Sequence, residues 1–125
     1  MSEPMILSER RDRILRLTLN RPPLNILNIP MLQELQRALE RVNEDVHIVL
    51  LESGIERAFS AGADVADHMP ERVEEMLTSL RRAIARLLEM EAVSVAVVRG
   101  HCLGGGMELT MSCDFLIAGE SARFG

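Results

Sequence analysis

At residues 99–109 the chain reads RGHCLGGGMEL, between an apolar run at 92–98 and a second apolar segment. Three consecutive glycines give up conformational entropy and pack no side chain, which is typical of backbone that must approach another group closely. If Gly104–Gly106 begin a helix, their N–H groups have no partner within it and favour an anion or a carbonyl oxygen. Glu108 then lies in the first turn beside these donors. The stretch predicts a carbonyl-binding site next to a carboxylate.

Composition and charge limit the classes of protein to which the chain can belong. Its 125 residues are enough for one domain with a core, and 47% are hydrophobic and 26% charged. The net charge is -5, every basic residue is an arginine and only three residues are aromatic, so nucleic-acid binding is not expected. The start lacks a signal-peptide pattern, and no apolar run reaches membrane-spanning length. We expect a cytoplasmic protein without nucleic-acid or membrane partners.

Cysteine and histidine positions give no indication of a metal site. Cys102 and Cys113 lie in apolar surroundings without metal-ligand spacing, and we expect them to be reduced core thiols. His47, His68 and His101 share no metal spacing. The glycine motifs of nucleotide-binding loops and the GxSxG nucleophile elbow are absent from the sequence. His101 adjoins the glycines, but we expect it to be packed or hydrogen-bonded.

The order of the predicted elements indicates an α/β protein. Short strands are predicted at 5–10, 13–19, 47–51, 93–98 and 115–118, with the start of another at 122–124. Apolar residues at helical spacing predict helices at 29–44, 71–91 and 103–112, the first capped by Asn28. An opening hairpin followed by alternating helices and strands favours a mixed or largely parallel sheet. The strands at 47–51 and 93–98 are nearly continuous in apolar character, so we expect both of their faces to be buried.

Two of these strands are followed by loops of small residues, at 60–64 and 104–108. Ligands bind beyond the carboxyl ends of strands in open α/β sheets, so the loops converge if the strands are neighbours. One backbone N–H from each would then lie about 3 Å from a shared carbonyl oxygen and form an oxyanion hole. Glu108, expected to be buried among apolar neighbours, either transfers protons or complements the helix dipole. The apolar loop at 24–27 fills the core or forms a pocket wall.

Four segments, in order, resemble the crotonase (enoyl-CoA hydratase/isomerase) superfamily. They are LNRP at 19–22, RAFSAGAD at 57–64, GHCLGGGMEL at 100–109 and CDFLIA at 113–118. The resemblance implies an α/β spiral of repeated β-β-α units, the ClpP/crotonase fold, assembled as homotrimers or homohexamers. It also implies an acyl thioester of coenzyme A as the ligand, with coenzyme A carried by the substrate and no covalently bound cofactor.

The resemblance also implies roles for individual residues. Ala63 and Gly105 match the two oxyanion-hole donors, and Glu108 matches the first catalytic glutamate of the hydratases. Arg57 falls where a basic residue often meets a CoA phosphate, although a solvated loop charge is the alternative. The remaining substrate- and CoA-binding positions implied are Pro23, Leu24, Ile26, Ala61, Asp64, Val65 and Gly104.

The chain departs from the family in length, because members run to roughly twice its size. Residues 1–125 are therefore expected to be the N-terminal portion of a single crotonase-like acyl-CoA-binding domain, incomplete at its C-terminus. A second catalytic glutamate follows a segment like 119–125 in hydratases. The implied reaction adds water to an α,β-unsaturated acyl-CoA, or shifts its double bond, through a thioester enolate. Residues 22–25, PPLN, also look like hydratases of cyclic dienoyl-CoA thioesters, and a non-catalytic acyl-CoA-binding or interaction module is the other alternative.

Overall fold

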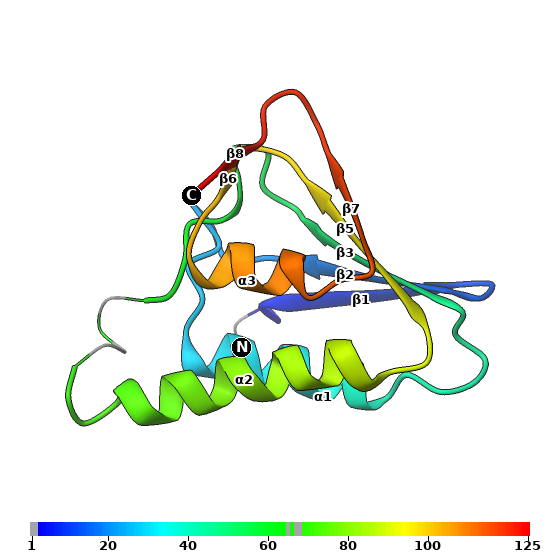
Figure 1. The fold of residues 1–125 in the computed structure, drawn as a ribbon, viewed down its shortest axis with the longest axis horizontal. Coiled ribbons are helices and arrows are strands. Elements are labelled where there is room, and N and C mark those ends of the chain that lie inside the picture. The colour runs from blue at the N-terminus through cyan, green and yellow to red at the C-terminus, as the bar shows by residue number, and fades with distance from the viewer. Residues whose placement is uncertain (1–2, 65, 67–68) are drawn as a thin grey trace.

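The computed structural model describes residues 3–64, 66 and 69–125 (Figure 1). Two sheets lie above a pair of helices, α1 (Ile29–Glu40) and α2 (Val73–Glu89), which pack against each other. The third helix, α3 (Gly105–Met111), contacts α2 and the smaller sheet. The predicted α/β class is confirmed.

The larger sheet has five strands in the order β1-β2-β3-β5-β7. Its first two strands form the predicted antiparallel hairpin, β1 (Ile6–Arg11) and β2 (Ile14–Leu19). The others are parallel to β2 and to one another: β3 (Ile48–Ser53), β5 (Val93–Val98) and β7 (Phe115–Ala118). Because β3 and β5 are neighbours, with Ile48 opposite Val93, the condition set for convergence of the two loops is met.

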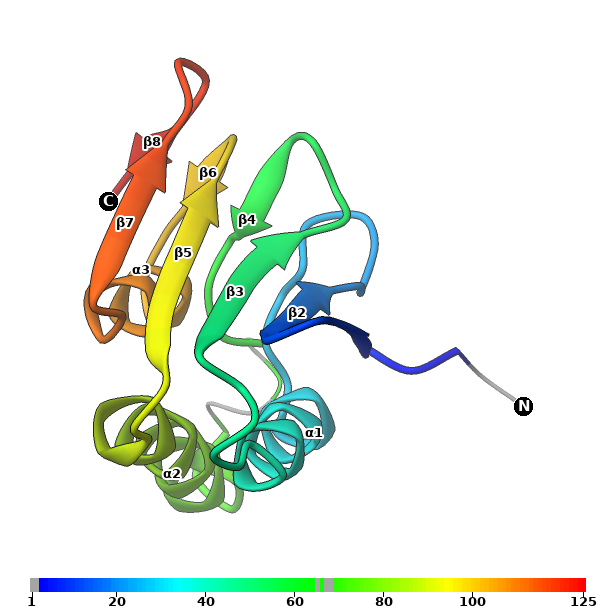
Figure 2. The same cartoon turned by 90° about the vertical axis from the view of Figure 1, so that its right-hand side faces the viewer.

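The smaller sheet consists of three very short parallel strands, β4 (Ala58–Ser60), β6 (His101–Cys102) and β8 (Arg123–Phe124). Each follows a strand of the larger sheet after a turn, so that the two sheets lie side by side (Figure 2). A helix follows the second strand in β3-β4-α2 and again in β5-β6-α3. The chain therefore repeats a β-β-α unit. Of these strands only β8 was predicted, as the start of a strand at 122–124, because β4 and β6 fall in segments whose sequence indicates loops.

The helices begin and end close to their predicted positions. Asn28 is the N-cap of α1, and its side-chain oxygen accepts a hydrogen bond from the Met31 N–H at 2.9 Å. The helix ends at Glu40 rather than at residue 44, because the Arg41 N–H bonds back to the Ala38 carbonyl and the Val42 N–H to the Leu39 carbonyl. α2 and α3 each start two residues later than predicted.

The core lies between the helices and one face of the larger sheet. Phe59, at the centre of β4, is the largest fully buried side chain among the described residues. Leucines of β2 and α1 belong to the same core. Burial alternates along β3 and β5 instead of extending to both faces. The prediction of strands buried on both faces is therefore wrong: one face packs on the helices, and the other is only partly covered.

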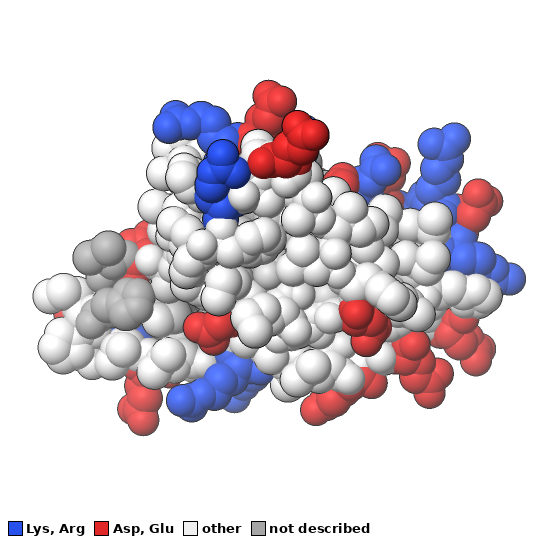
Figure 3. Space-filling model, turned by 45° about the horizontal axis from the view of Figure 1, so that its top comes forward, with Lys and Arg blue, Asp and Glu red and all other residues white. Residues whose placement is uncertain are grey.

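The described surface is mixed in character. Acidic and basic groups are interspersed around an uncharged area on the face shown in Figure 3, and no continuous basic stripe crosses that face. Apolar side chains are exposed on α3 and β7, where Met111 is 70% and Phe115 63% accessible. Within the described ranges, no helix combines the length and the apolar character that crossing a membrane requires.

Candidate active site

The two small-residue loops converge as predicted. The Leu103 N–H donates to the Ser60 carbonyl at 3.0 Å, which joins the glycine loop to the end of β4. A Cβ placed on Gly104 would lie 3.8 Å from the Gly62 Cα. The residues that follow these two glycines, Ala63 and Gly105, are therefore brought to the same place from opposite sides.

The three consecutive glycines have three different surroundings. Gly104 has φ 52° and ψ -122°, a left-handed conformation that L side chains rarely adopt. Gly106 has no room for a side chain, because a Cβ would lie 2.7 Å from the Ser60 Cβ. At Gly105 a Cβ would meet only side-chain ends, the nearest being Leu27 Cδ1 at 3.4 Å. The glycine run predicted both an unusual backbone conformation and a close approach. Gly104 has the unusual conformation, and Gly106 makes the close approach.

Ala63 and Gly105 each present an N–H group that has no partner among the described residues. Leu27 donates its N–H to the Gly62 carbonyl and accepts from the Asp64 N–H, both at 2.8 Å, so the Ala63 N–H points away from Leu27. Gly105 is the first residue of α3, where an N–H has no acceptor within the helix. Throughout the described ranges, neither N–H donates to a protein acceptor.

Glu108 lies in the first turn of α3, three residues after Gly105. Its side chain is exposed, so the prediction that it is buried among apolar residues is wrong. The reason is that α3 packs on its other side, where Leu109 and Thr110 are buried, while Met111 is also exposed. No hydrogen bond or ion pair engages the Glu108 carboxylate in the part of the chain that the structure describes.

A small cavity of about 140 Å³ lies beside the loops. Four of the predicted substrate-binding residues line it: Pro23, Leu24, Ile26 and Asp64. Arg21 and Pro22 complete the lining. The 24–27 loop forms a pocket wall and also fills the core, with alternate residues. Leu24 and Ile26 are half-buried and line the cavity, whereas Asn25 and Leu27 are buried in the interior.

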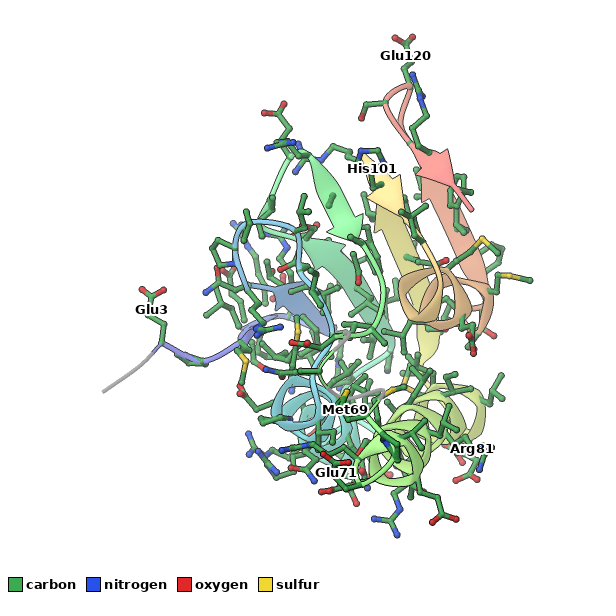
Figure 4. The ribbon with its side chains drawn as sticks, turned by 90° about the vertical axis from the view of Figure 1, so that its left-hand side faces the viewer. Glu3, Met69, Glu71, Arg81, His101 and Glu120 are labelled. Carbon is green, nitrogen blue, oxygen red and sulfur yellow. The ribbon has the colours of Figure 1, made fainter. Side chains whose placement is uncertain are left out.

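The other predicted residues do not line this cavity. Ala61 lies next to it, and its N–H donates to the Leu24 carbonyl at 3.0 Å. Arg57 is exposed at the start of β4, a three-residue strand and therefore about 10 Å from the loop at the strand's end. Val65 lies outside the described residues. His101 is exposed at the outer end of β6 (Figure 4), and its imidazole has no hydrogen bond to any described residue, so the prediction that it is packed or hydrogen-bonded is wrong.

A buried polar network, which sequence reasoning missed, holds the loops together. Asn25 is fully buried and donates to Ser53 Oγ at 2.8 Å and to the Phe59 carbonyl at 3.0 Å. Ser60 Oγ donates to the Asn25 carbonyl at 2.7 Å and accepts from the Gly62 N–H at 3.2 Å. The only signal in the sequence is an asparagine between two apolar residues, which by itself indicates a turn.

The thiols agree with the prediction of reduced core cysteines. Both are free, and Cys102 is buried. Burial raises the pKa of Cys102 and raises that of Cys113 to about 11, in each case against an opposing hydrogen bond, with Thr110 and Ser94 respectively. No group of three or more potential metal ligands occurs among the described residues.

Comparison with known proteins places this geometry in a family. Residues 9–125 match the sequence model of the enoyl-CoA hydratase/isomerase family. The whole chain is 40% identical over 128 residues to 2,3-dehydroadipyl-CoA hydratase of Escherichia coli strain K12, of which it covers 49%. Over 118 residues, 94% of the chain, it is 35% identical to cyclohexa-1,5-dienecarbonyl-CoA hydratase of Thauera aromatica, covering 46% of that protein.

A crystal structure described as an enoyl-CoA hydratase/carnithine racemase from Magnetospirillum magneticum has the same fold. The TM-score is 0.91 at 31% identity, over 99% of this chain and 49% of that one. The chain thus spans about half the length of the relatives it matches. The repeated β-β-α units, the paired small-residue loops and the match over residues 9–125 together establish that the chain belongs to the enoyl-CoA hydratase/isomerase family.

Proposed function

We propose that this chain supplies the oxyanion hole and one proton-transferring carboxylate of an enzyme that adds water to an α,β-unsaturated acyl-CoA or shifts its double bond. The observation that carries the proposal is the meeting of two loops that leave the N–H groups of Ala63 and Gly105 without protein acceptors. Two such donors stabilise a thioester oxygen more strongly as it becomes negative.

Each group has a defined part in the proposed reaction. Addition of water to the β-carbon moves electrons onto the thioester oxygen, where the two N–H groups stabilise the enolate. Glu108 accepts the proton of the attacking water, and a second acid returns a proton to the α-carbon. The exposure of the Glu108 carboxylate and the absence of a partner for it among the described residues support this part.

The substrate class follows from what the relatives share. The names of two relatives specify a linear dehydroadipyl and a cyclic dienecarbonyl group, each an unsaturated acyl-CoA. We propose the same class here, without a choice between linear and cyclic acyl groups. The cavity of about 140 Å³ is smaller than the pockets of several hundred Å³ that hold a small molecule, so further polypeptide is expected to complete its wall. Assembly as a homotrimer or homohexamer, a CoA-phosphate contact by Arg57 and a cytoplasmic location stay predictions.

The proposal is tested by Glu108→Gln in the complete protein, with crotonyl-CoA as substrate. Loss of a general base is expected to lower the hydration rate by about 10²- to 10⁴-fold, because the amide cannot accept the proton of the water. Glu40→Gln is the matched control: it makes the same chemical change at the exposed end of α1 and should leave the rate unchanged. Unimpaired hydration by Glu108→Gln would remove Glu108 from the mechanism. Thioester binding without hydration by the wild type would favour a binding module.

A further inference from the structure

We propose that Arg21 is a positioning residue: by tying Asp64 to the 21–27 segment, its guanidinium fixes the direction of the Ala63 N–H. The inference rests on the proposed function, because it gives Arg21 a part in holding the oxyanion hole. Arg21 was not among the residues predicted to form the site.

One nitrogen of Arg21 joins two segments that are far apart in the sequence. Its Nη1 atom donates to the Ile26 carbonyl at 2.7 Å and lies 3.3 Å from Asp64 Oδ2. The two side chains are 33% and 25% exposed, so water screens this pair less than it screens the exposed ion pairs of the surface. The second oxygen of the carboxylate, Asp64 Oδ1, accepts from the Ala66 N–H at 2.9 Å. The carboxylate is thus held from both sides.

These contacts hold the residue that follows the peptide unit carrying the Ala63 N–H. That unit is fixed on its other side by the hydrogen bond from Leu27 to the Gly62 carbonyl, at 2.8 Å. Arg21 holds the residue just before Leu27 and the residue just after Ala63. The guanidinium therefore links the two segments beside the short parallel bridge that pairs Leu27 with Ala63.

The donor needs such a clamp because Gly62 precedes it. Gly62 has φ 109°, a conformation that only glycine adopts readily. A glycine also leaves its adjoining peptide units free to rotate at little energetic cost, so the backbone at residue 62 does not by itself select one direction for the Ala63 N–H. The bridge to Leu27 selects that direction, and Arg21 holds the bridge.

Kinetics separate positioning from direct binding of coenzyme A. A donor that turns away loses its interaction mainly in the transition state, where the oxygen is negative, so kcat falls and KM changes little. If Arg21 instead bound a phosphate of coenzyme A, its loss would raise KM with kcat unchanged. The Arg21 Nη1 atom contacts the Ile26 carbonyl and the Asp64 carboxylate, both groups of the protein itself. These contacts favour a positioning role over binding of coenzyme A.

The test uses Arg21→Gln and Asp64→Asn in the complete protein, with crotonyl-CoA carrying ¹³C at the thioester carbonyl. We expect each variant to lower kcat by about tenfold or more, a part of the 10²- to 10³-fold effect of losing a whole donor. KM should stay within about twofold. The downfield shift of the bound carbonyl resonance should be smaller in both variants than in the wild type. The kcat of the double variant should be little lower than that of the less active single variant.

Arg13→Gln is the matched control, because Arg13 and Asp45 form an ion pair of the same 3.3 Å length at the opposite end of the larger sheet. It should leave kcat and the carbonyl shift unchanged. If Arg21→Gln does not fold, Asp64→Asn decides the outcome, since it keeps the Oδ1 acceptor. The role of Arg21 is overturned if Asp64→Asn has the full carbonyl shift and the wild-type kcat. It is also overturned if the variants raise KM and leave kcat unchanged. Neither outcome affects the proposed function. A wild type that shifts no carbonyl and hydrates no thioester overturns the proposed function itself.

Discussion

At the scale of single residues, Gly106 shows how closely the two loops approach. A Cβ there would lie 2.7 Å from the Ser60 Cβ and 2.9 Å from its carbonyl oxygen. Ser60 cannot move away without loss, since its carbonyl accepts from Leu103 and its hydroxyl bonds both Asn25 and Gly62. A side chain at residue 106 would therefore disturb the whole buried network.

We predict that Gly106→Ala lowers the free energy of unfolding by about 1–3 kcal/mol, the usual effect of overpacking a rigid site. Gly105→Ala should change it by less than about 1 kcal/mol, because the added Cβ meets only the flexible ends of Leu27 and Leu80, at 3.4 and 3.6 Å. Urea denaturation of the two variants checks the difference. Equal stability of the two variants would show that contact with Ser60 is not what requires glycine at residue 106.

The sequence was sufficient to predict that the two loops converge, but not the network that holds them together. Small residues in two loops indicate backbone close to a ligand, because only small residues permit it. The roles of Asn25 and Ser60 depend on partners 28 to 35 residues away, at Ser53 and in β4. A polar residue in an apolar loop does not reveal from sequence alone whether it meets water or a buried partner.

At the scale of the elements, α1 is held at the site by its first turn. Asn28 caps the helix immediately after Leu27, the residue that bonds Gly62 and Asp64. The side chain satisfies the Met31 N–H, one of the donors that a helix start leaves without a partner. The cap therefore fixes where the chain leaves the oxyanion-hole region and enters the helix.

We predict that Asn28→Ala lowers the free energy of unfolding by about 1 kcal/mol, because the Met31 N–H loses its acceptor. Asn28→Asp keeps an acceptor oxygen at the same position and should leave the stability nearly unchanged. Thermal and urea unfolding of the two variants provide the measurement. If alanine and aspartate have the same effect, the cap does not contribute to stability.

Long elements were predictable, whereas two of the three very short strands, β4 and β6, were not. The periodic apolar residues of α1 and α2 predicted both helices, with ends that differ from the structure by at most four residues. β4 and β6 contain three and two residues, too few for any period to appear. Their strand character comes from pairing with each other and with β8, which is a property of the tertiary structure.

At the scale of the whole molecule, β7 is exposed on both of its faces. Phe115, Leu116 and Ile117 are 63%, 40% and 59% accessible, and β7 is an edge strand of the larger sheet. An apolar run of this kind was predicted as a strand, and the prediction is confirmed. Its exposure was not predictable, because burial depends on what packs against the strand. Exposed apolar side chains on an edge strand are a ready site for contact with further polypeptide.

The arrangement of the strands brings the candidate site together. β3 and β5 are parallel neighbours, so the segments after them leave the sheet on the same side and pair as β4 and β6. The loops beyond β4 and β6 then place Ala63 and Gly105 together. In the proposed function these two N–H groups, rather than any side chain, receive the thioester oxygen.

Replacement of Gly105 by proline tests this claim most directly. Proline is well accepted as the first residue of a helix but has no N–H, whereas alanine at the same position keeps the donor. In the complete protein, Gly105→Pro is predicted to lower kcat for crotonyl-CoA hydration by about 10²- to 10³-fold, and Gly105→Ala to retain most of the activity. Circular dichroism confirms that both variants are folded. If a folded Gly105→Pro variant hydrated crotonyl-CoA as fast as Gly105→Ala, the Gly105 N–H would not be an oxyanion-hole donor.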